Sequence, residues 1–223
     1  MNTLAHQFSK VLASATTERP IAQWLKKHPK ILAGATSARY VTSEFSLGTD
    51  YRVDFVSLEP FSGGFFVTFI ELERPNDPLF TRAGKPAKRL VDAMTQIDRW
   101  RIFIEKNRPA VLRELSKFFE KRELVFNRGQ EPTCNAGFHL YDPIMALIWK
   151  YVIIAGRRGS LDRSQLQMKS AFKNNHDIEL MTYDRVLQHT SGYHRLQTRA
   201  SFEQWMKDVT RGLAVNEQRP RAQ

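Results

Sequence analysis

The sequence predicts an α/β protein in which helices flank a central mixed β-sheet. Three observations support this fold class. The expected elements run in the order helix, group of strands, two helices, then alternating strand and helix. Residues Phe65–Leu72 form a run that is apolar on both faces, as expected of a central strand covered on both sides. Helical stretches with one apolar face lie before and after that run, so helices can cover both faces of the sheet.

The N-terminal half is predicted to contain one helix and three strands. The helix begins at Pro20, because proline suits a first helical position, and it ends at His28, because a residue before proline avoids the helical region. Residues 59–64 contain proline and two glycines, which predicts a turn between the second and third strands. The expected bounds are Pro20–Lys27 for the helix, and Tyr40–Leu47, Tyr51–Leu58 and Phe65–Leu72 for the strands.

The C-terminal half is predicted to alternate helices and strands. The expected elements are helices Ala87–Lys106 and Ala110–Lys121, strand Trp149–Ala155, helix Asp162–Lys173, strand Ile178–Thr182 and a last helix from Tyr183. Pro109 separates the first two helices, because proline lacks the backbone N–H that a helix interior needs. Residues 122–146 give no clear pattern. We expect a single domain over residues 1–213 and a frayed polar tail over residues 214–223.

Composition narrows the possible partners and cofactors. The 223 residues include 34 Lys and Arg against 23 Asp and Glu, a net charge of +11 that favours DNA, RNA or an anionic membrane surface as partner. The single cysteine, Cys134, excludes disulfide frameworks and cysteine-based zinc sites. No glycine-rich loop followed by Gly-Lys-Ser/Thr is present, so we expect no nucleotide cofactor. The N-terminus does not read as a signal peptide and the longest apolar stretch is too short to span a bilayer, so we expect a cytoplasmic protein.

Three carboxylates stand out by their positions. Asp54 lies inside a predicted strand, where carboxylates are depleted. Glu71 and Glu73 end the apolar strand and are two residues apart, so both point to the same face. Neighbouring strands would bring Asp54 to the glutamates, and three close carboxylates need a cation such as Mg²⁺ or Mn²⁺. The alternative is that both glutamates face solvent and pair with nearby basic residues.

The order of these motifs resembles that of a known nuclease superfamily. The matching segments are 22–29, 51–56, 70–75, 96–100, 152–157 and 182–184. Over about residues 20–189 the chain is similar to the PD-(D/E)xK nuclease superfamily and, more narrowly, to the Shedu (SduA) anti-phage defence family. The resemblance implies a restriction-endonuclease-like sheet, metal ligation by Asp54, Glu71 and the Leu72 carbonyl, and a Gln96 side chain that positions water or phosphate. It also implies a homo-oligomer.

One position departs from the family pattern. Where the family usually has lysine, this chain has Glu73, which removes a cation from the expected site. Lys85 or Lys88 could replace that cation, or Glu73 could help to hold a second metal ion. The resemblance implies a Mg²⁺- or Mn²⁺-dependent DNA endonuclease in anti-phage defence. The departure keeps a second hypothesis open, a catalytically inactive nucleic-acid-binding or regulatory module of the same fold.

Two groups of cations are candidates for contacts with nucleic-acid phosphates. Arg157 and Arg158 follow the predicted strand Trp149–Ala155, where a charged loop without a binding role is an equally good interpretation. The second group lies at the start of the predicted helix after the glutamates and comprises Lys85, Lys88 and Arg89. Such a row is commonly a solvated helix face, but here it lies next to the expected acidic site.

Overall fold

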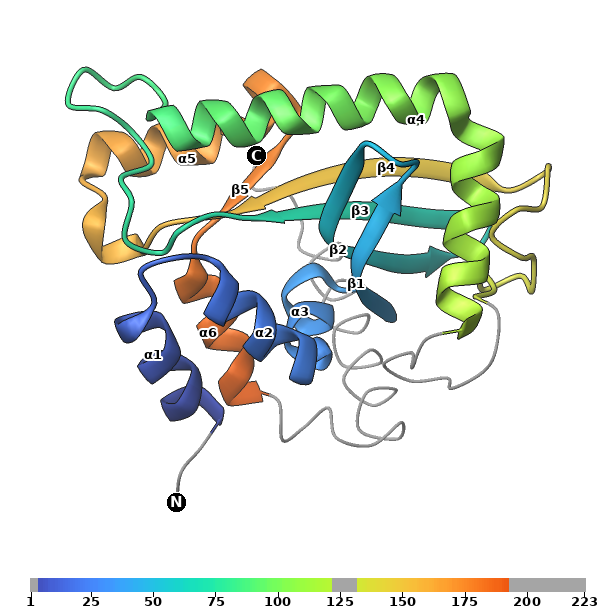
Figure 1. Ribbon diagram of the computed structural model, residues 1–223, viewed down its shortest axis with the longest axis horizontal. Coiled ribbons are helices and arrows are strands. Elements are labelled where there is room, and N and C mark those ends of the chain that lie inside the picture. Colours follow the sequence, from blue (N-terminus) through green and yellow to red (C-terminus); the bar gives the residue numbers. More distant parts are fainter. Residues whose placement is uncertain (1–3, 122–131, 193–223) are drawn as a thin grey trace, which may run out of the picture.

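The computed structural model describes residues 4–121 and 132–192 and contains a five-stranded mixed β-sheet between two layers of helices (Figure 1). The strands lie in chain order across the sheet: β1 (Tyr40–Leu47), β2 (Tyr51–Phe61), β3 (Gly64–Leu72), β4 (Ala146–Ile154) and β5 (Glu179–Met181). β1, β2 and β3 pair antiparallel, whereas β3, β4 and β5 pair parallel. The predicted α/β class with a restriction-endonuclease-like mixed sheet is confirmed. The expected tail, residues 214–223, lies outside the described residues.

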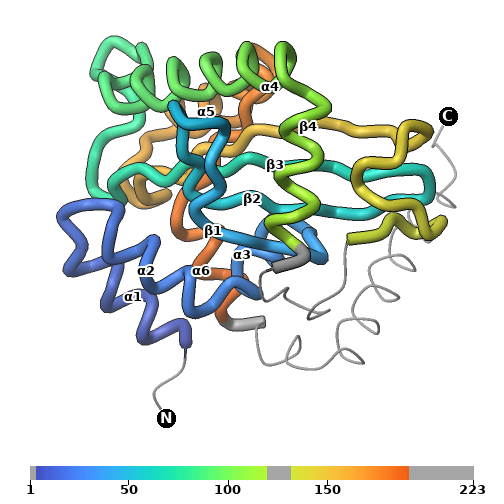
Figure 2. The backbone as a smooth tube through the Cα atoms, turned by 45° about the vertical axis from the view of Figure 1, so that its right-hand side comes forward, coloured from blue at the N-terminus to red at the C-terminus, as the bar shows by residue number. Residues whose placement is uncertain are grey.

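Helices cover both faces of the sheet. One face carries α4 (Lys88–Lys121) and α5 (Arg163–His176), and the opposite face carries α1 (Leu4–Ser14), α2 (Arg19–Lys27), α3 (Pro29–Thr36) and α6 (Tyr183–Gly192). A short 3₁₀ turn, η1 (Arg158–Ser160), leads into α5. Figures 1 and 2 show the two layers from directions 45° apart. No helix in the described part of the chain is long and apolar enough to cross a membrane.

The central strand β3 divides the hydrophobic interior into two cores. Phe65, Val67 and Phe69 belong to the core beneath α4, which we call the α4 core. Ile70 and Leu72 belong to the core beneath the N-terminal helices and α6, which we call the N-terminal core. Side chains alternate between faces along a strand, so the odd-numbered residues of β3, including Glu71, point towards α4.

The β1–β2 hairpin bends where Glu44 lies. In a regular strand Val41 and Phe45 would share a face, yet Val41 belongs to the N-terminal core and Phe45 to the α4 core. The backbone of Glu44 between them has φ of 60°, a left-handed conformation that costs a non-glycine residue about 1–3 kcal/mol. The same change of face occurs on β2, opposite Glu44. In a regular strand Val53 and Phe55 would share a face, yet Val53 belongs to the α4 core and Phe55 to the N-terminal core.

The bend turns the tip of this hairpin towards α4, as both views show (Figures 1 and 2). There the ring of Tyr51 meets the ring of Phe103 edge to face, with centroids 5.8 Å apart. Gly48 approaches the same ring so closely that an added Cβ would lie 2.7 Å from it, and its φ is 64°. A side chain at position 48 would therefore push the tip away from α4.

Helix α4 kinks in its second half. The range Lys88–Lys121 contains the two helices expected on either side of Pro109, which meet at a kink where the backbone of Asn107 leaves helical geometry, with φ of −123° and ψ of 21°. The side-chain amide of Asn107 donates to the Phe103 carbonyl at 2.9 Å, which satisfies an acceptor where the ladder is interrupted. After the kink, Phe119 packs against Tyr40 of β1. The first helix thus ends at the kink just before Pro109, as the sequence predicted, and the second helix changes direction around the sheet.

The N-terminal region contains more helix than the sequence predicted. Helix α1 buries Phe8 and Leu12, and α3 buries five consecutive residues against the sheet. The predicted end of α2 at His28 is confirmed, but the next helix starts immediately at Pro29. Proline favours the first helical turn, and the sequence analysis used this rule for Pro20 but not for Pro29, where α3 begins.

Candidate functional site

The predicted carboxylates Asp54 and Glu71 lie on adjacent strands. The β2–β3 ladder ends at the pair Phe55–Ile70, so Asp54 and Glu71 occupy the next opposing positions. Leu72 donates its backbone N–H to Asp54 Oδ2 at 2.9 Å. This hydrogen bond holds the half-buried Asp54 carboxyl against the end of β3.

Gln96 reaches the site from α4, as predicted. Its side-chain amide donates to Glu71 Oε1 at 2.9 Å. Glu71 is only 9% exposed, and its second oxygen, Oε2, is buried with no hydrogen-bond partner in the described part of the protein. A buried acceptor without a donor is costly, so Oε2 requires a proton or a cation.

The local electrostatics favour protonated carboxyls when no cation is present. Burial, followed by the charges of Asp54 and Glu73, raises the pKa of Glu71 to about 9 against the opposing Gln96 hydrogen bond. Burial raises the pKa of Glu73 to about 7, although the charge of Arg89 works against the rise. Burial also raises the pKa of Asp54, despite its hydrogen bond from the Leu72 amide. We call Asp54, Glu71 and Glu73 the acidic row.

Glu73 follows β3, and its main chain is held from two sides. Its N–H donates to the Ile154 carbonyl of β4 at 2.9 Å. Its carbonyl accepts a 2.7 Å hydrogen bond from the hydroxyl of Tyr183, a fully buried residue at the start of α6. The backbone that carries the acidic row is therefore fixed to the parallel half of the sheet and to α6.

Glu18 is a fourth carboxylate near the row that sequence reasoning missed. It precedes α2, and its negative charge contributes to the raised pKa values of Asp54, Glu71 and Glu73. Its Oε2 lies 3.9 Å from Nε of Arg74. The sequence contains only a weak signal, an acidic residue before a predicted helix, because nothing local indicates that this helix starts beside the end of β3.

Comparison with known protein families identifies the chain. The family model described as Shedu protein SduA, C-terminal, matches residues 15–187, which is more than three quarters of the 223 residues. The chain belongs to this Shedu family. The match includes all five strands and the acidic row, and membership suggests a role in anti-phage defence. A comparison with curated proteins gave no significant match.

The oxygen atoms near the end of β3 could supply some, but not all, of the ligands of a hard divalent cation. Within residues 4–121 and 132–192, no group of three or more Asp, Glu, His or Cys side chains is arranged to hold a metal ion. The oxygens on offer are the carboxylates of Asp54 and Glu71 and the Leu72 carbonyl. Magnesium commonly takes one or two carboxylates and completes its shell with water and phosphate, so an all-protein cage is unnecessary. The orphaned Oε2 of Glu71 supports this fit.

The predicted cationic residues of the Shedu chain occupy two places. Lys85, Lys88 and Arg89 are exposed around the start of α4, where Arg89 Nε binds Asp77 Oδ2 at 2.9 Å. Arg157 is partly exposed and forms an ion pair in which its Nη2 and Nε donate to Asp184 Oδ1 at 3.0 and 3.2 Å. The Arg158 backbone N–H donates to the other oxygen of Asp184. Arg157 therefore fastens the end of β4 to α6.

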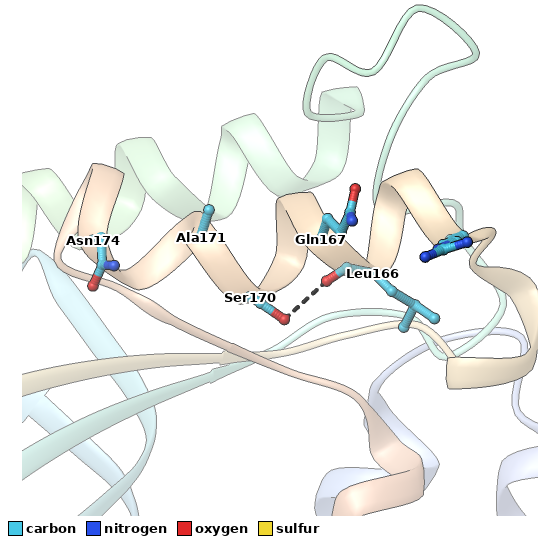
Figure 3. Close-up of a pocket in the computed structure, with 6 residues that line it drawn as sticks. Leu166, Gln167, Ser170, Ala171 and Asn174 are labelled. Carbon is cyan, nitrogen blue, oxygen red and sulfur yellow. Dashed lines mark hydrogen bonds between the residues drawn. The ribbon is translucent and has the colours of Figure 1, made fainter. Parts of the chain in front are cut away.

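A surface depression of about 540 Å³ lies on α5, and no residue of the acidic row lines it (Figure 3). Its lining comes from one helix: Arg163, Leu166, Gln167, Ser170, Ala171 and Asn174. The Ser170 hydroxyl donates to the Leu166 carbonyl of its own helix at 3.0 Å. With no carboxylate and no second wall, this depression has no donor set for a metal ion.

Proposed function

We propose that this Shedu-family protein is a metal-dependent DNA endonuclease that acts in anti-phage defence. The observation that carries the proposal is the buried Glu71 carboxyl, which is bound by Gln96 on one oxygen and has no partner on the other. A purely structural carboxyl so deeply buried would normally have both oxygens satisfied. A cation would supply the missing contact.

Asp54, Glu71 and the Leu72 carbonyl would hold Mg²⁺ or Mn²⁺. When bound, the ion would supply positive charge at the scissile phosphate. Gln96 fixes one oxygen of Glu71 and so limits how that carboxylate can rotate. The Leu72 amide does the same for Asp54. The net charge of +11 favours association with the polyanionic DNA backbone.

Glu73 supports a second candidate function, a nucleic-acid-binding module that does not cleave. The side chain adds negative charge where family members usually have lysine, and that charge opposes the approach of a phosphate. Arg89 offsets this effect in part, because its positive charge lies close enough to act on the Glu73 carboxylate. Cleavage measurements decide between the two candidates.

The test is a cleavage assay with purified protein, plasmid DNA and linear DNA, in Mg²⁺, Mn²⁺ or EDTA. We expect cleavage in either metal, none in EDTA, and none from Asp54→Asn or Glu71→Gln. Glu114→Gln is the matched control, because Glu114 is 64% exposed in the second half of α4. The absence of cleavage by the natural chain, together with retained DNA binding, would support the non-cleaving module. Cleavage that survives in both site variants would refute the site assignment.

A further inference from the structure

Three charged side chains from separate elements meet beside the acidic row. Lys26 of α2 and Arg52 of β2 both form ion pairs with Oε1 of Glu44 in β1. Because two cations share one carboxylate, the three side chains together carry a net positive charge. The Arg52 side chain is 63% exposed and that of Lys26 is 31% exposed, so both can be reached from solvent. We call these residues the Glu44 cluster.

The backbone of Glu44 is the unusual feature of this cluster. Among the described residues, three non-glycine residues have positive φ: Ser37, Glu44 and Asp177. Ser37 and Asp177 end helices, where left-handed geometry is common. Glu44 lies inside a strand, so the surrounding structure must enforce its conformation. Such outliers concentrate at binding and catalytic sites.

The cluster stands at the Asp54 end of the acidic row. Glu44 is opposite Asp54 in the hairpin, since the flanking pairs are Ser43–Phe55 and Phe45–Val53. Arg52 lies two residues before Asp54 on the same strand.

Arg89 stands at the other end of the row. Its charge acts on Glu73, whereas the cations of the Glu44 cluster act on Asp54. Arg89 is itself paired with Asp77, so the net positive charge beside the row lies at the Glu44 cluster, where two cations share one carboxylate. A nucleic-acid strand laid along the carboxylates would meet that charge on the Asp54 side, which would compensate in part for the repulsion between the row and the strand.

We propose that Lys26 and Arg52, positioned by Glu44, bind a backbone phosphate of the nucleic acid on the Asp54 side of the acidic row. The inference rests on the proposed function and assigns a contact to residues outside the metal ligands. Arginine and lysine are the usual side chains for such contacts, and they fix the position of the strand without reading its sequence. The ion pair with Lys26 alone would be enough for Glu44 to tie α2 to the hairpin. The second ion pair, with Arg52, places an additional positive charge beside the row.

The test is the salt dependence of DNA binding, measured by fluorescence anisotropy with a labelled duplex in Ca²⁺, which permits binding to be followed without Mg²⁺ or Mn²⁺. Lys26→Gln and Arg52→Gln should each lower the slope of log Kd against log salt by about one, and the double variant by about two. The loss should be the same for unrelated DNA sequences. Lys117→Gln is the matched control, because Lys117 also pairs with a glutamate but lies beyond the kink of α4.

The outcomes separate this inference from the proposed nuclease activity. An unchanged slope in the double variant, with cleavage by the natural chain in Mg²⁺, overturns the phosphate contact alone. A reduced slope without cleavage by the natural chain supports the contact and refutes the nuclease. No binding by the natural chain at low salt overturns both. Melting curves of every variant confirm that the fold persists, and glutamine is used because it keeps much of the side-chain length.

Discussion

Replacing Glu71 with glutamine should stabilise the metal-free protein at neutral pH. In the folded protein the pKa of Glu71 is raised from 4.5 to about 9 by burial and by the nearby carboxylates. At pH 7 the folded state therefore holds a proton on Glu71 that the unfolded state has lost. Glutamine reproduces the neutral, hydrogen-bonded group without requiring that proton. The variant therefore avoids the free-energy cost of protonating Glu71 in the folded state, and its free energy of unfolding should be higher.

The size of the stabilisation depends on the pKa of Glu71 in the unfolded state, its pKa in the folded state, and the pH of the measurement. A raised pKa gives its full stabilising contribution below about pH 4.5, and the contribution is lost as the pH rises towards about 9. Between pH 4.5 and pH 7 the natural protein loses roughly 1.4 kcal/mol per pH unit from this group, or about 3 kcal/mol. For a chain of this size, that difference corresponds to roughly 6–12 °C in Tm.

The assay is thermal unfolding in EDTA from pH 4.5 to pH 9, with Glu71→Gln compared to the natural chain. The two curves should coincide near pH 4.5 and diverge as the pH rises, with the variant more stable. Glu73 contributes in the same direction in both proteins, so the difference isolates Glu71. Glu114→Gln should match the natural chain throughout. A variant that is equally or less stable than the natural chain at pH 8 would refute the buried, protonated Glu71.

Three further predictions concern the metal, Glu73 and Arg157. Added Mn²⁺ or Mg²⁺ should raise the Tm of the natural chain in a concentration-dependent way, and Asp54→Ala should lose the gain; an equal gain in the variant would place the ion elsewhere. If the carboxylate acts in the chemical step, Glu73→Ala should abolish cleavage and leave DNA binding nearly intact. If the natural chain does not cut, Glu73→Lys should restore cleavage by returning a cation, and an inactive lysine variant would contradict that account. Arg157→Ala should lower the free energy of unfolding by about 2 kcal/mol, because Asp184 loses two charge-assisted hydrogen bonds, and an unchanged melting curve would count against this role.

The arrangement of Asp54, Glu71 and Gln96 could be predicted because it depends on local rules. A short turn joins β2 and β3, so the two strands had to be neighbours, and the period of two fixed the face on which Glu71 lies. The helix after the polar loop covers that face, which brings Gln96 within hydrogen-bond distance of Glu71. The resemblance to the Shedu family supplied the choice of Gln96 among the polar residues of α4.

The remaining site residues depend on contacts between segments that are distant in the sequence. Glu18 lies near the acidic row only because α2 packs on the N-terminal core, and no local pattern determines that placement. No sequence pattern singles out Lys26, because its partner Glu44 belongs to another element. The left-handed backbone of Glu44 also has no sequence signal, because glycine or asparagine is the usual occupant of such a position.

The hydrogen bond from Tyr183 to Glu73 joins residues that are 110 positions apart. During synthesis on the ribosome, Asp54, Glu71 and Gln96 emerge long before β4, β5 and α6 are made. Until β4 has paired with β3, the end of β3 lacks its parallel neighbour, and until Tyr183 has docked, the carbonyl of Glu73 lacks its hydroxyl donor. A nascent chain therefore carries every proposed metal ligand before the segments that anchor Glu73 are made, and the anchoring of Glu73 is completed by the arrival of α6.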